Sequence, residues 1–327
     1  MVILGNASIH PSSRLQTRGL GLHDEEHAEA LRPLFRFGKA HNCEVVVQLQ
    51  HYGAQGRMQS TTQPLLSPSG IGCPRLNAKQ PHYRAVEMTH DDIKTVRQYY
   101  VEAAVRAYHA GARIVQLQAA NGYLLSSFLS PYTNVRHDKY GGSPAKRMRL
   151  LCEIVDDIRS ACPALLLSVR LGIDDGLDNK GQRPELIAPH VQQLESLGVV
   201  WLSLSMTINE TFHLLMTHPD AARQRLYSGI SVLREATSLP IGFAGLTANL
   251  AQGEQVMERL KVELVGMTRA LFADNDLIIK TQQQRDGEIH ACRFDGNCFK
   301  DKSNPALDQV YCCVNPNYLR PSHIHYE

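Results

Sequence analysis

The sequence predicts an α/β fold of the (β/α)8 barrel type, and two observations lead to this prediction. Short runs of apolar and β-branched residues alternate with longer segments of helical spacing, which is typical of parallel strands joined by crossover helices. The chain of 327 residues is also 43% hydrophobic and 20% charged, so it is long enough to bury the large core of a barrel.

The predicted elements follow one another as strand and helix along most of the chain. Small residues, glycine or proline in the segments AGAR, SLGV and TSLP mark the points where a helix ends and a strand begins. The predicted strands are 2–7, 44–51, 114–120, 165–173, 200–206, 240–245 and 264–269. The predicted helices are 25–41, 90–110, 145–161, 185–197, 228–237, 249–260 and 271–285.

An eight-stranded barrel needs eight βα units, and the sequence shows seven. Because the chain opens directly on a strand, we expect the lacking unit to be the first. Residues 52–89 are rich in Gly, Pro, Ser and Gln and predict a long loop, at the end of a barrel where loops usually carry function. We therefore expect a barrel domain over 1–286 and an irregular, cysteine-containing tail over 287–327 that packs on it.

Composition narrows the classes of partner. Lys and Arg total 34 against 32 Asp and Glu, a net charge of +2, so no electrostatic argument favours nucleic acid or an anionic membrane. No apolar run approaches the roughly 18 residues of a membrane span, and MVILGNASIHPSSR lacks the features of a signal peptide. We predict a cytoplasmic protein with reduced cysteines that binds a small molecule.

Polar side chains stand at the carboxyl ends of several predicted strands. Gln48 and Gln50 end one strand, Gln118 ends the next, and Arg170 lies late in a further strand. Because the loops at this end of a barrel converge over its axis, these residues are candidate site residues. The alternative is that they are ordinary hydrogen-bonded polar groups of the barrel interior.

Two segments of small residues near the end of the predicted barrel also lie at the carboxyl ends of strands, so they are candidate site segments too. GFAG (242–245) and VGMT (265–268), the latter followed by Arg269, close the last two predicted strands. They would present free backbone N–H groups and a guanidinium where barrels of this kind commonly bind a phosphate.

The longest specific motif is NGYLLSSFLSPYTNVRHDKYGGS (121–143). Together with VVVQLQHYGAQGR, LSVRLG and VGMTRALFADNDL, it makes the sequence resemble the old yellow enzyme family of FMN-dependent ene-reductases. The resemblance covers nearly the whole chain. It implies a TIM barrel that holds FMN at its C-terminal mouth, is reduced by NAD(P)H, and reduces activated C=C bonds of the enone or enoate type.

The resemblance also implies which residues contact the cofactor. Gln48 looks like the amide that hydrogen-bonds the flavin pyrimidine ring, and Ala7 looks like a backbone contact near the ring. Arg170 resembles the cation beside the N1 side of the flavin, where it would offset negative charge. The phosphate end corresponds to Gly245, Gly266 and Arg269.

Three residues in the motif or just before it match the family's catalytic positions. Tyr123 matches the phenol that gives a proton to the substrate carbon opposite the hydride, and Asn121 matches one of two side chains that polarise the substrate oxygen. The other is usually a histidine, and here it is Gln118. A glutamine donates a hydrogen bond without the tunable charge of an imidazole, so we expect weaker enolate stabilisation or a different substrate. Alternatively, Gln118 and Asn121 are structural amides that bond to each other.

The tail contains a second group of cysteines. Cys292, Cys298 and Cys312 resemble ligands of the [4Fe–4S] cluster in the trimethylamine dehydrogenase and dienoyl-CoA reductase branch, but Asp295 stands where that branch has its second cysteine. Thiolates are the usual cluster ligands, so we expect neither an iron–sulfur cluster nor another metal here. Zinc with Cys313 as the fourth ligand, or a structural tail, are the alternatives.

Three functions remain open at this stage. The first is an FMN-dependent ene-reductase, and the second is a desaturase or isomerase that uses the same flavin chemistry. The third is a flavin-free barrel that acts as a binding protein or an inactive fragment, which the lacking first strand would favour because it leaves strand edges exposed. The resemblance also implies possible homo-oligomers.

Overall fold

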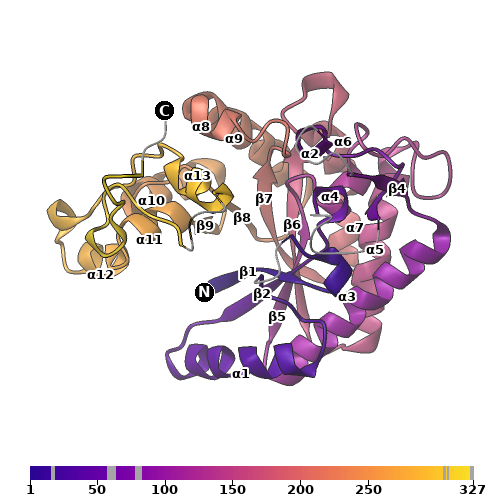
Figure 1. Ribbon diagram of the computed structural model, residues 1–327, viewed down its shortest axis with the longest axis horizontal. Coiled ribbons are helices and arrows are strands. Elements are labelled where there is room, and N and C mark those ends of the chain that lie inside the picture. Colours follow the sequence, from indigo (N-terminus) through magenta and orange to yellow (C-terminus); the bar gives the residue numbers. More distant parts are fainter. Residues whose placement is uncertain (16–18, 57–63, 78–82, 305–306, 308, 325–327) are drawn as a thin grey trace. The chain divides into compact units, whose positions relative to one another are not determined.

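The computed structural model describes residues 1–15, 19–56, 64–77, 83–304, 307 and 309–324 (Figure 1). The chain divides into two compact units. The first contains Met1–Phe212 and Ser228–Pro240, and the second contains His213–Tyr227 and Ile241–Glu327. The boundary predicted at residue 286, between barrel and tail, stays a prediction.

All seven predicted strands form. In the first unit, five strands pair in parallel with their neighbours in chain order. They are β1 (Val2–Ser8), β2 (Val45–Gln50), β5 (Ile114–Ala119), β6 (Leu166–Asp174) and β7 (Val199–Met206). In the second unit, β8 (Ile241–Ala244) pairs in parallel with β9 (Leu264–Gly266). Parallel strands of this kind need a crossover after each strand, and helices supply it.

Local sequence signals set the ends of the main helices of the first unit. A capping box between Thr89 and Asp92 begins α3 (His90–Ala110), and Gly111 ends it in the left-handed region at φ 113°. The Ser143 side chain caps α5 (Pro144–Ala161), which has proline at its first position. Helix α3 packs against α5 and against α1 (Glu25–Ala40) along one side of the sheet (Figure 1).

Among the remaining helices, α9 is as long as α5 and the others are shorter. In or near the loops of the first unit lie α2 (Pro74–Asn77), α4 (Leu124–Leu129), α6 (Pro184–Ile187) and α7 (Val191–Ser196). The rest are α8 (Leu214–Thr217), α9 (Pro219–Ala236), α10 (Leu250–Leu260), α11 (Thr268–Ala273), α12 (Leu277–Gln282) and α13 (Asn297–Ser303).

Three predicted helices differ from the structure in extent. The helix predicted over 185–197 divides into α6, a 3-10 helix (Ala188–His190) and α7, because Pro189 has no N–H for the ladder. The helix predicted from 228 begins at Pro219. The helix predicted over 271–285 becomes α11 and α12, since the Asp274 side chain accepts the Asp276 N–H and forms a turn between them.

The region predicted as a long loop, 52–89, contains a small parallel sheet. Its strands are β3 (Leu65–Ser67) and β4 (Ala85–Glu87). A cluster of Leu65, Cys73 and Tyr83 forms an apolar core beneath it, and the Cys73 N–H donates to the Tyr83 hydroxyl at 2.9 Å. Residues 57–63 and 78–82 of the predicted loop lie outside the described residues.

The central strands of the first unit carry amides on one face and aliphatic side chains on the other. In β2, Val47 and Leu49 alternate with Gln48 and Gln50, and all four are buried. Neighbouring β5 repeats the pattern, with glutamines at 116 and 118 between aliphatic residues. Because side chains alternate along a strand, the amides of both strands lie on the same face of the sheet.

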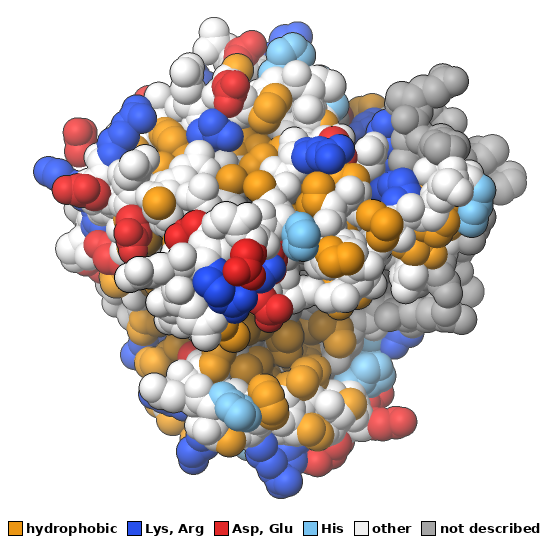
Figure 2. Space-filling view, turned by 90° about the vertical axis from the view of Figure 1, so that its left-hand side faces the viewer, with side chains coloured by type: hydrophobic (Ala, Val, Ile, Leu, Met, Phe, Trp, Pro, Cys, Tyr) orange, Lys and Arg blue, Asp and Glu red, His pale blue; other side chains and the backbone are white. Residues whose placement is uncertain are grey.

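The outer surface matches the balanced composition. On the face drawn in Figure 2, basic and acidic side chains are interspersed rather than separated by sign. Among the described residues, no helix combines the length and the apolar character that crossing a membrane requires.

Candidate functional site

The first unit brings Gln48 and Gln118 into direct contact. The Gln118 amide nitrogen donates to the Gln48 Oε1 at 3.2 Å, and the Gln48 nitrogen donates to the Gln116 Oε1 at 2.6 Å. The Gln118 Oε1 in turn accepts the backbone N–H of Ala120 at 3.1 Å. The predicted flavin contact and the predicted oxygen-polarising residue therefore belong to one buried hydrogen-bonded group.

Asn121 stands directly after β5 in a turn that its neighbours stabilise. Its backbone has φ 62°, in the left-handed region that asparagine tolerates. Its side-chain nitrogen lies 3.2 Å from the Met206 carbonyl and 3.4 Å from the Ser205 Oγ, and its own carbonyl accepts from Gln55 at 2.9 Å. Gln118 and Asn121 thus bond to other groups in this structure, contrary to the alternative in which they bond to each other.

Arg170 and Tyr123 lie close enough for their charges to interact. Burial lowers the pKa of Arg170. Burial raises the pKa of Tyr123, and the positive charge of Arg170 acts on that pKa in the opposite direction. The Tyr123 ring also packs edge-on against Tyr52, with ring centroids 5.0 Å apart. The phenol therefore keeps its proton at neutral pH and lies within electrostatic range of a cation.

Sequence reasoning missed three residues of this group. Gln116 and Ser168 extend the hydrogen-bonded amides, with the Gln116 nitrogen donating to the Ser168 Oγ at 3.2 Å. Ser205 accepts from the Arg170 Nη2 at 3.2 Å. Gln116 lies two residues before Gln118, so the period of two in a strand was the signal that could have found it.

Buried polar atoms without partners indicate that this region fits a polar ligand. Among the described residues, the Arg170 Nε and the Thr207 Oγ1 are buried without a hydrogen-bond partner. Arg170 lies in the middle of β6, and Thr207 directly follows β7. Since leaving such atoms unpaired costs free energy, a ligand with donors and acceptors would stabilise the site. Ala7, fully buried on β1, is in register with Leu49 of β2.

The second unit contains the residues predicted for a phosphate. Gly245 has φ 128°, and a Cβ on Gly266 would lie only 2.9 Å from the Ala244 Cβ, so glycine is needed at both positions. Arg269 lies in the first turn of α11, and its guanidinium stacks on the rings of Phe294 and Phe299 at 4.8 and 5.7 Å. Its buried Nη1 has no hydrogen-bond partner among the described residues, which suits an anionic ligand.

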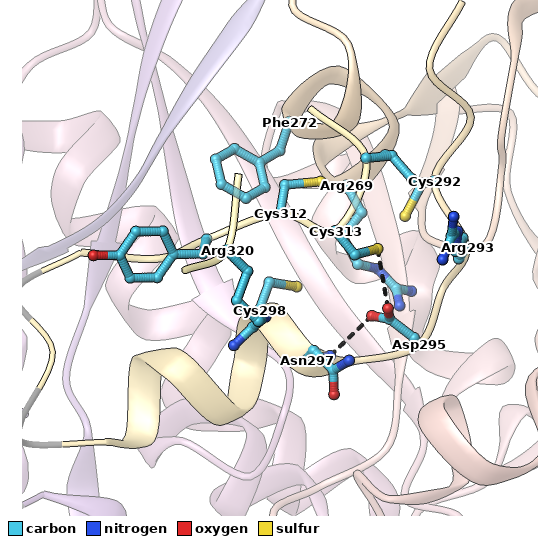
Figure 3. Close-up of a pocket in the computed structure, with 12 residues that line it drawn as sticks. Arg269, Phe272, Cys292, Arg293, Asp295, Asn297, Cys298, Cys312, Cys313 and Arg320 are labelled. Carbon is cyan, nitrogen blue, oxygen red and sulfur yellow. Dashed lines mark hydrogen bonds between the residues drawn. The ribbon is translucent and has the colours of Figure 1, made fainter. Parts of the chain in front are cut away.

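The cysteines of the tail line one pocket of the second unit. Figure 3 shows Cys292, Cys298, Cys312 and Cys313 around it together with Arg269. The Cys313 thiol donates to the Asp295 Oδ2 at 3.1 Å, and burial raises the pKa of Cys313 to about 11. Within the described ranges, no three His, Cys, Asp or Glu side chains are placed to hold a metal ion. The donor set does not fit a cluster held by four thiolates, because Asp295 stands where the second cysteine ligand of the pattern would be and accepts a hydrogen bond from the Cys313 thiol.

Successive βα units with a polar cluster at the carboxyl ends of their strands define the class of α/β-barrel enzymes. The sequence model of the NADH:flavin oxidoreductase / NADH oxidase family matches residues 1–288, and the chain belongs to that family. This membership confirms the predicted flavoprotein class, with FMN as cofactor and NAD(P)H as reductant.

Individual relatives agree with the family. The chain is 29% identical over 277 residues to the NADPH dehydrogenase of Geobacillus sp. strain WCH70, covering 83% of this chain and 76% of that protein. It is also 29% identical to the NADH oxidase of Thermoanaerobacter brockii over 97% of this chain and 48% of that protein. These relatives support an oxidoreductase that uses a nicotinamide cofactor.

Solved structures confirm the predicted barrel fold. A 2-naphthoyl-CoA reductase complex superposes with a TM-score of 0.84 at 23% identity, covering 97% of this chain and 49% of that one. The old yellow enzyme homologue from Zymomonas mobilis gives 0.72 at 20% identity over 86% of this chain and 79% of that one. The chain thus spans about half the length of the reductase.

Proposed function

We propose that the protein reduces activated C=C bonds of small α,β-unsaturated carbonyl compounds with NAD(P)H, and that Tyr123 supplies the proton. FMN, when bound, provides the hydride chemistry of the reaction. In the first unit, Gln48, Arg170 and the backbone at Ala7 would hold its ring. In the second unit, Gly245, Gly266 and Arg269 remain the residues predicted for a phosphate. The unpaired Arg170 and Thr207 atoms support a bound polar ligand over the flavin-free alternative.

The observation that carries the proposal is the buried, neutral phenol of Tyr123 within electrostatic range of Arg170, in the turn that also contains Asn121. Because burial raises the pKa of Tyr123, the hydroxyl retains its proton until it meets a more basic carbanion. A cation nearby favours the phenolate that remains after the proton has left. The Tyr123 hydroxyl therefore suits a proton donor to the substrate α-carbon.

Gln118 is proposed to polarise the substrate oxygen, and Asn121 would join it once its side-chain nitrogen releases the Met206 carbonyl or the Ser205 Oγ. The Gln118 nitrogen donates one N–H to the Gln48 Oε1, and its second N–H remains for the substrate. That N–H is neutral, so it stabilises a developing enolate less than an imidazolium does. We therefore expect low rates with simple enones and higher rates with substrates that carry stronger electron-withdrawing groups.

The first experiment is an anaerobic absorption titration of the purified protein. Oxidised-flavin bands that bleach with NADPH and return with an activated alkene are the expected result. The alkene must be recovered as its saturated product, with one deuteron from D₂O at the α-carbon. A protein that stays colourless after incubation with FMN would contradict the proposal, and a flavin that only oxygen reoxidises would restrict the function to an oxidase.

A further inference from the structure

Four buried hydrogen bonds join three strands of the first unit, and we call them the amide ladder. The ladder begins where the Ala120 N–H donates to the Gln118 Oε1, and it continues from the Gln118 nitrogen to the Gln48 Oε1. The Gln48 nitrogen donates to the Gln116 Oε1, and the Gln116 nitrogen donates to the Ser168 Oγ. Gln48 and Gln118 are 5% and 4% exposed, and Gln116 and Ser168 are fully buried.

The ladder has one direction, and its first donor sets that direction. A backbone N–H can only donate, so the atom of Gln118 that faces Ala120 must be its oxygen. The Gln118 nitrogen then faces Gln48, which turns the Gln48 oxygen toward it and the Gln48 nitrogen toward Gln116. Reversing any one amide would place two donors or two acceptors against each other among buried side chains, which is costly.

The direction of the ladder determines which atoms of Gln48 remain for a ligand. Its nitrogen uses one of two hydrogens on Gln116, and its oxygen uses one of two lone pairs on Gln118. One donor and one acceptor of known identity remain for a ligand. The 2.6 Å bond to Gln116 is the shortest in the ladder, and the in-register pairing of Gln48 with Gln116 across β2 and β5 holds both backbones in place.

We propose that Gln116 is a positioning residue that holds the Gln48 amide in the orientation that binds the flavin pyrimidine ring. This inference rests on the proposed function, because it takes FMN as the ligand of Gln48. Gln116 acts through Gln48 by accepting its N–H, and Ser168 completes the ladder behind it. Without that acceptor, only the 3.2 Å bond from Gln118 holds the Gln48 amide, and part of the affinity is lost in fixing its orientation.

The test compares three variants by FMN titration of the apoprotein, with quenching of FMN fluorescence as the signal. Gln116→Met removes the acceptor at similar volume, and we expect FMN affinity to fall about tenfold, the value of one hydrogen bond. Gln116→Glu keeps an oxygen for Gln48, while the Ser168 hydroxyl turns to donate, so its affinity should stay within about threefold of wild type. Gln182→Met is the matched control, because Gln182 is also a buried glutamine (3% exposed) of the same unit.

The outcomes distinguish a failure of this inference from a failure of the proposed function. A wild-type protein that binds no FMN contradicts the proposed function and this inference with it. A wild type that binds FMN, with Gln116→Met binding equally well, contradicts the inference alone. Equal losses in Gln116→Met and Gln116→Glu, or a similar loss in Gln182→Met, show a general packing effect and also contradict it. Should Gln116→Met fail to fold, Gln116→Asn moves the acceptor away from Gln48 without removing the amide, and the same loss is expected.

Discussion

Asn121 and Arg170 donate to the same oxygen, the Ser205 Oγ, at 3.4 and 3.2 Å. The two donors come from different parts of the chain, since Asn121 follows β5 and Arg170 lies within β6. Ser205 lies on β7 and is 5% exposed. One buried hydroxyl thus connects a proposed substrate contact with a proposed cofactor contact.

Replacing Ser205 should therefore disturb both contacts at once. In Ser205→Ala, the Asn121 amide and the Arg170 guanidinium lose a shared acceptor, and we expect kcat/KM for alkene reduction to fall about tenfold. Ser203→Ala is the control, because Ser203 lies two residues earlier on the same strand, is also 5% exposed and is in register with Arg170. Steady-state rates of both variants check the prediction, and equal rates would show that Ser205 does not position the two donors.

Tyr123→Phe should separate the two half-reactions. Reduction of the enzyme by NADPH does not need the phenol, so its rate should stay within about twofold of wild type, while reoxidation by an alkene should slow by about 100-fold or more. Because burial raises the pKa of Tyr123 above the ordinary phenol value, the wild-type alkene step should be independent of pH from neutrality up to at least that ordinary value of about 10. Stopped-flow absorbance measures both steps. Tyr52→Phe controls for loss of a neighbouring hydroxyl, and an alkene step equally fast in Tyr123→Phe would exclude the proposed donor.

The order of strands and helices follows from the sequence because apolar periodicity is local. The strand predicted at 114–120 and the helix predicted at 90–110 both form as expected. Pro189 interrupts a predicted helix because it lacks the N–H that the ladder needs. Such an interruption is visible in the sequence, whereas the parallel pairing of β3 and β4 depends on residues twenty positions apart.

The candidate site could be predicted only in part for a similar reason. Motif resemblance identifies Gln48, Asn121 and Tyr123 one at a time, but it does not show which groups these side chains contact. The role of Ser205 depends on two donors that meet it from other strands. Arg269 was expected to face a phosphate, and its stacking on Phe294 depends on a tail segment without regular periodicity.

A buried ion pair should stabilise the tail of the second unit. Both oxygens of Asp301, whose side chain is fully buried, accept from the Arg320 guanidinium, and one also accepts the Tyr311 N–H at 2.9 Å. Arg320→Met leaves a buried carboxylate without its cation, so we expect a loss of about 3 kcal/mol in the free energy of unfolding. Arg285→Met is the control, because the Arg285–Glu288 pair is exposed (42% and 58%) and such pairs contribute little. Urea unfolding measures both, and similar losses in the two variants would contradict the prediction.

Asp175 is a buried carboxyl that should make stability depend on pH. It is 2% exposed, and burial raises its pKa to about 6, with Asp174 and Glu210 acting in the same direction. The Ser130 hydroxyl and the Gln182 N–H both donate to its Oδ2, at 2.6 and 2.7 Å. The raised pKa means that the folded protein binds the proton more tightly than the unfolded chain does. Its contribution to stability is therefore full below about pH 4 and is lost as the pH rises through about 6.

Asp175→Asn should remove this dependence without removing the hydrogen bonds. Both donors meet the same oxygen, so an asparagine that places its Oδ1 there keeps both bonds and stays neutral at every pH. We expect the variant to match the wild type at pH 4 and to exceed its free energy of unfolding by about 3 kcal/mol at pH 8. Asp178→Asn, a change at an exposed position of the same loop, should leave stability unchanged at both values. Urea unfolding at pH 4, 6 and 8 checks the prediction, and a variant that is less stable than the wild type at pH 8 would mean that the ionised carboxylate stabilises this turn.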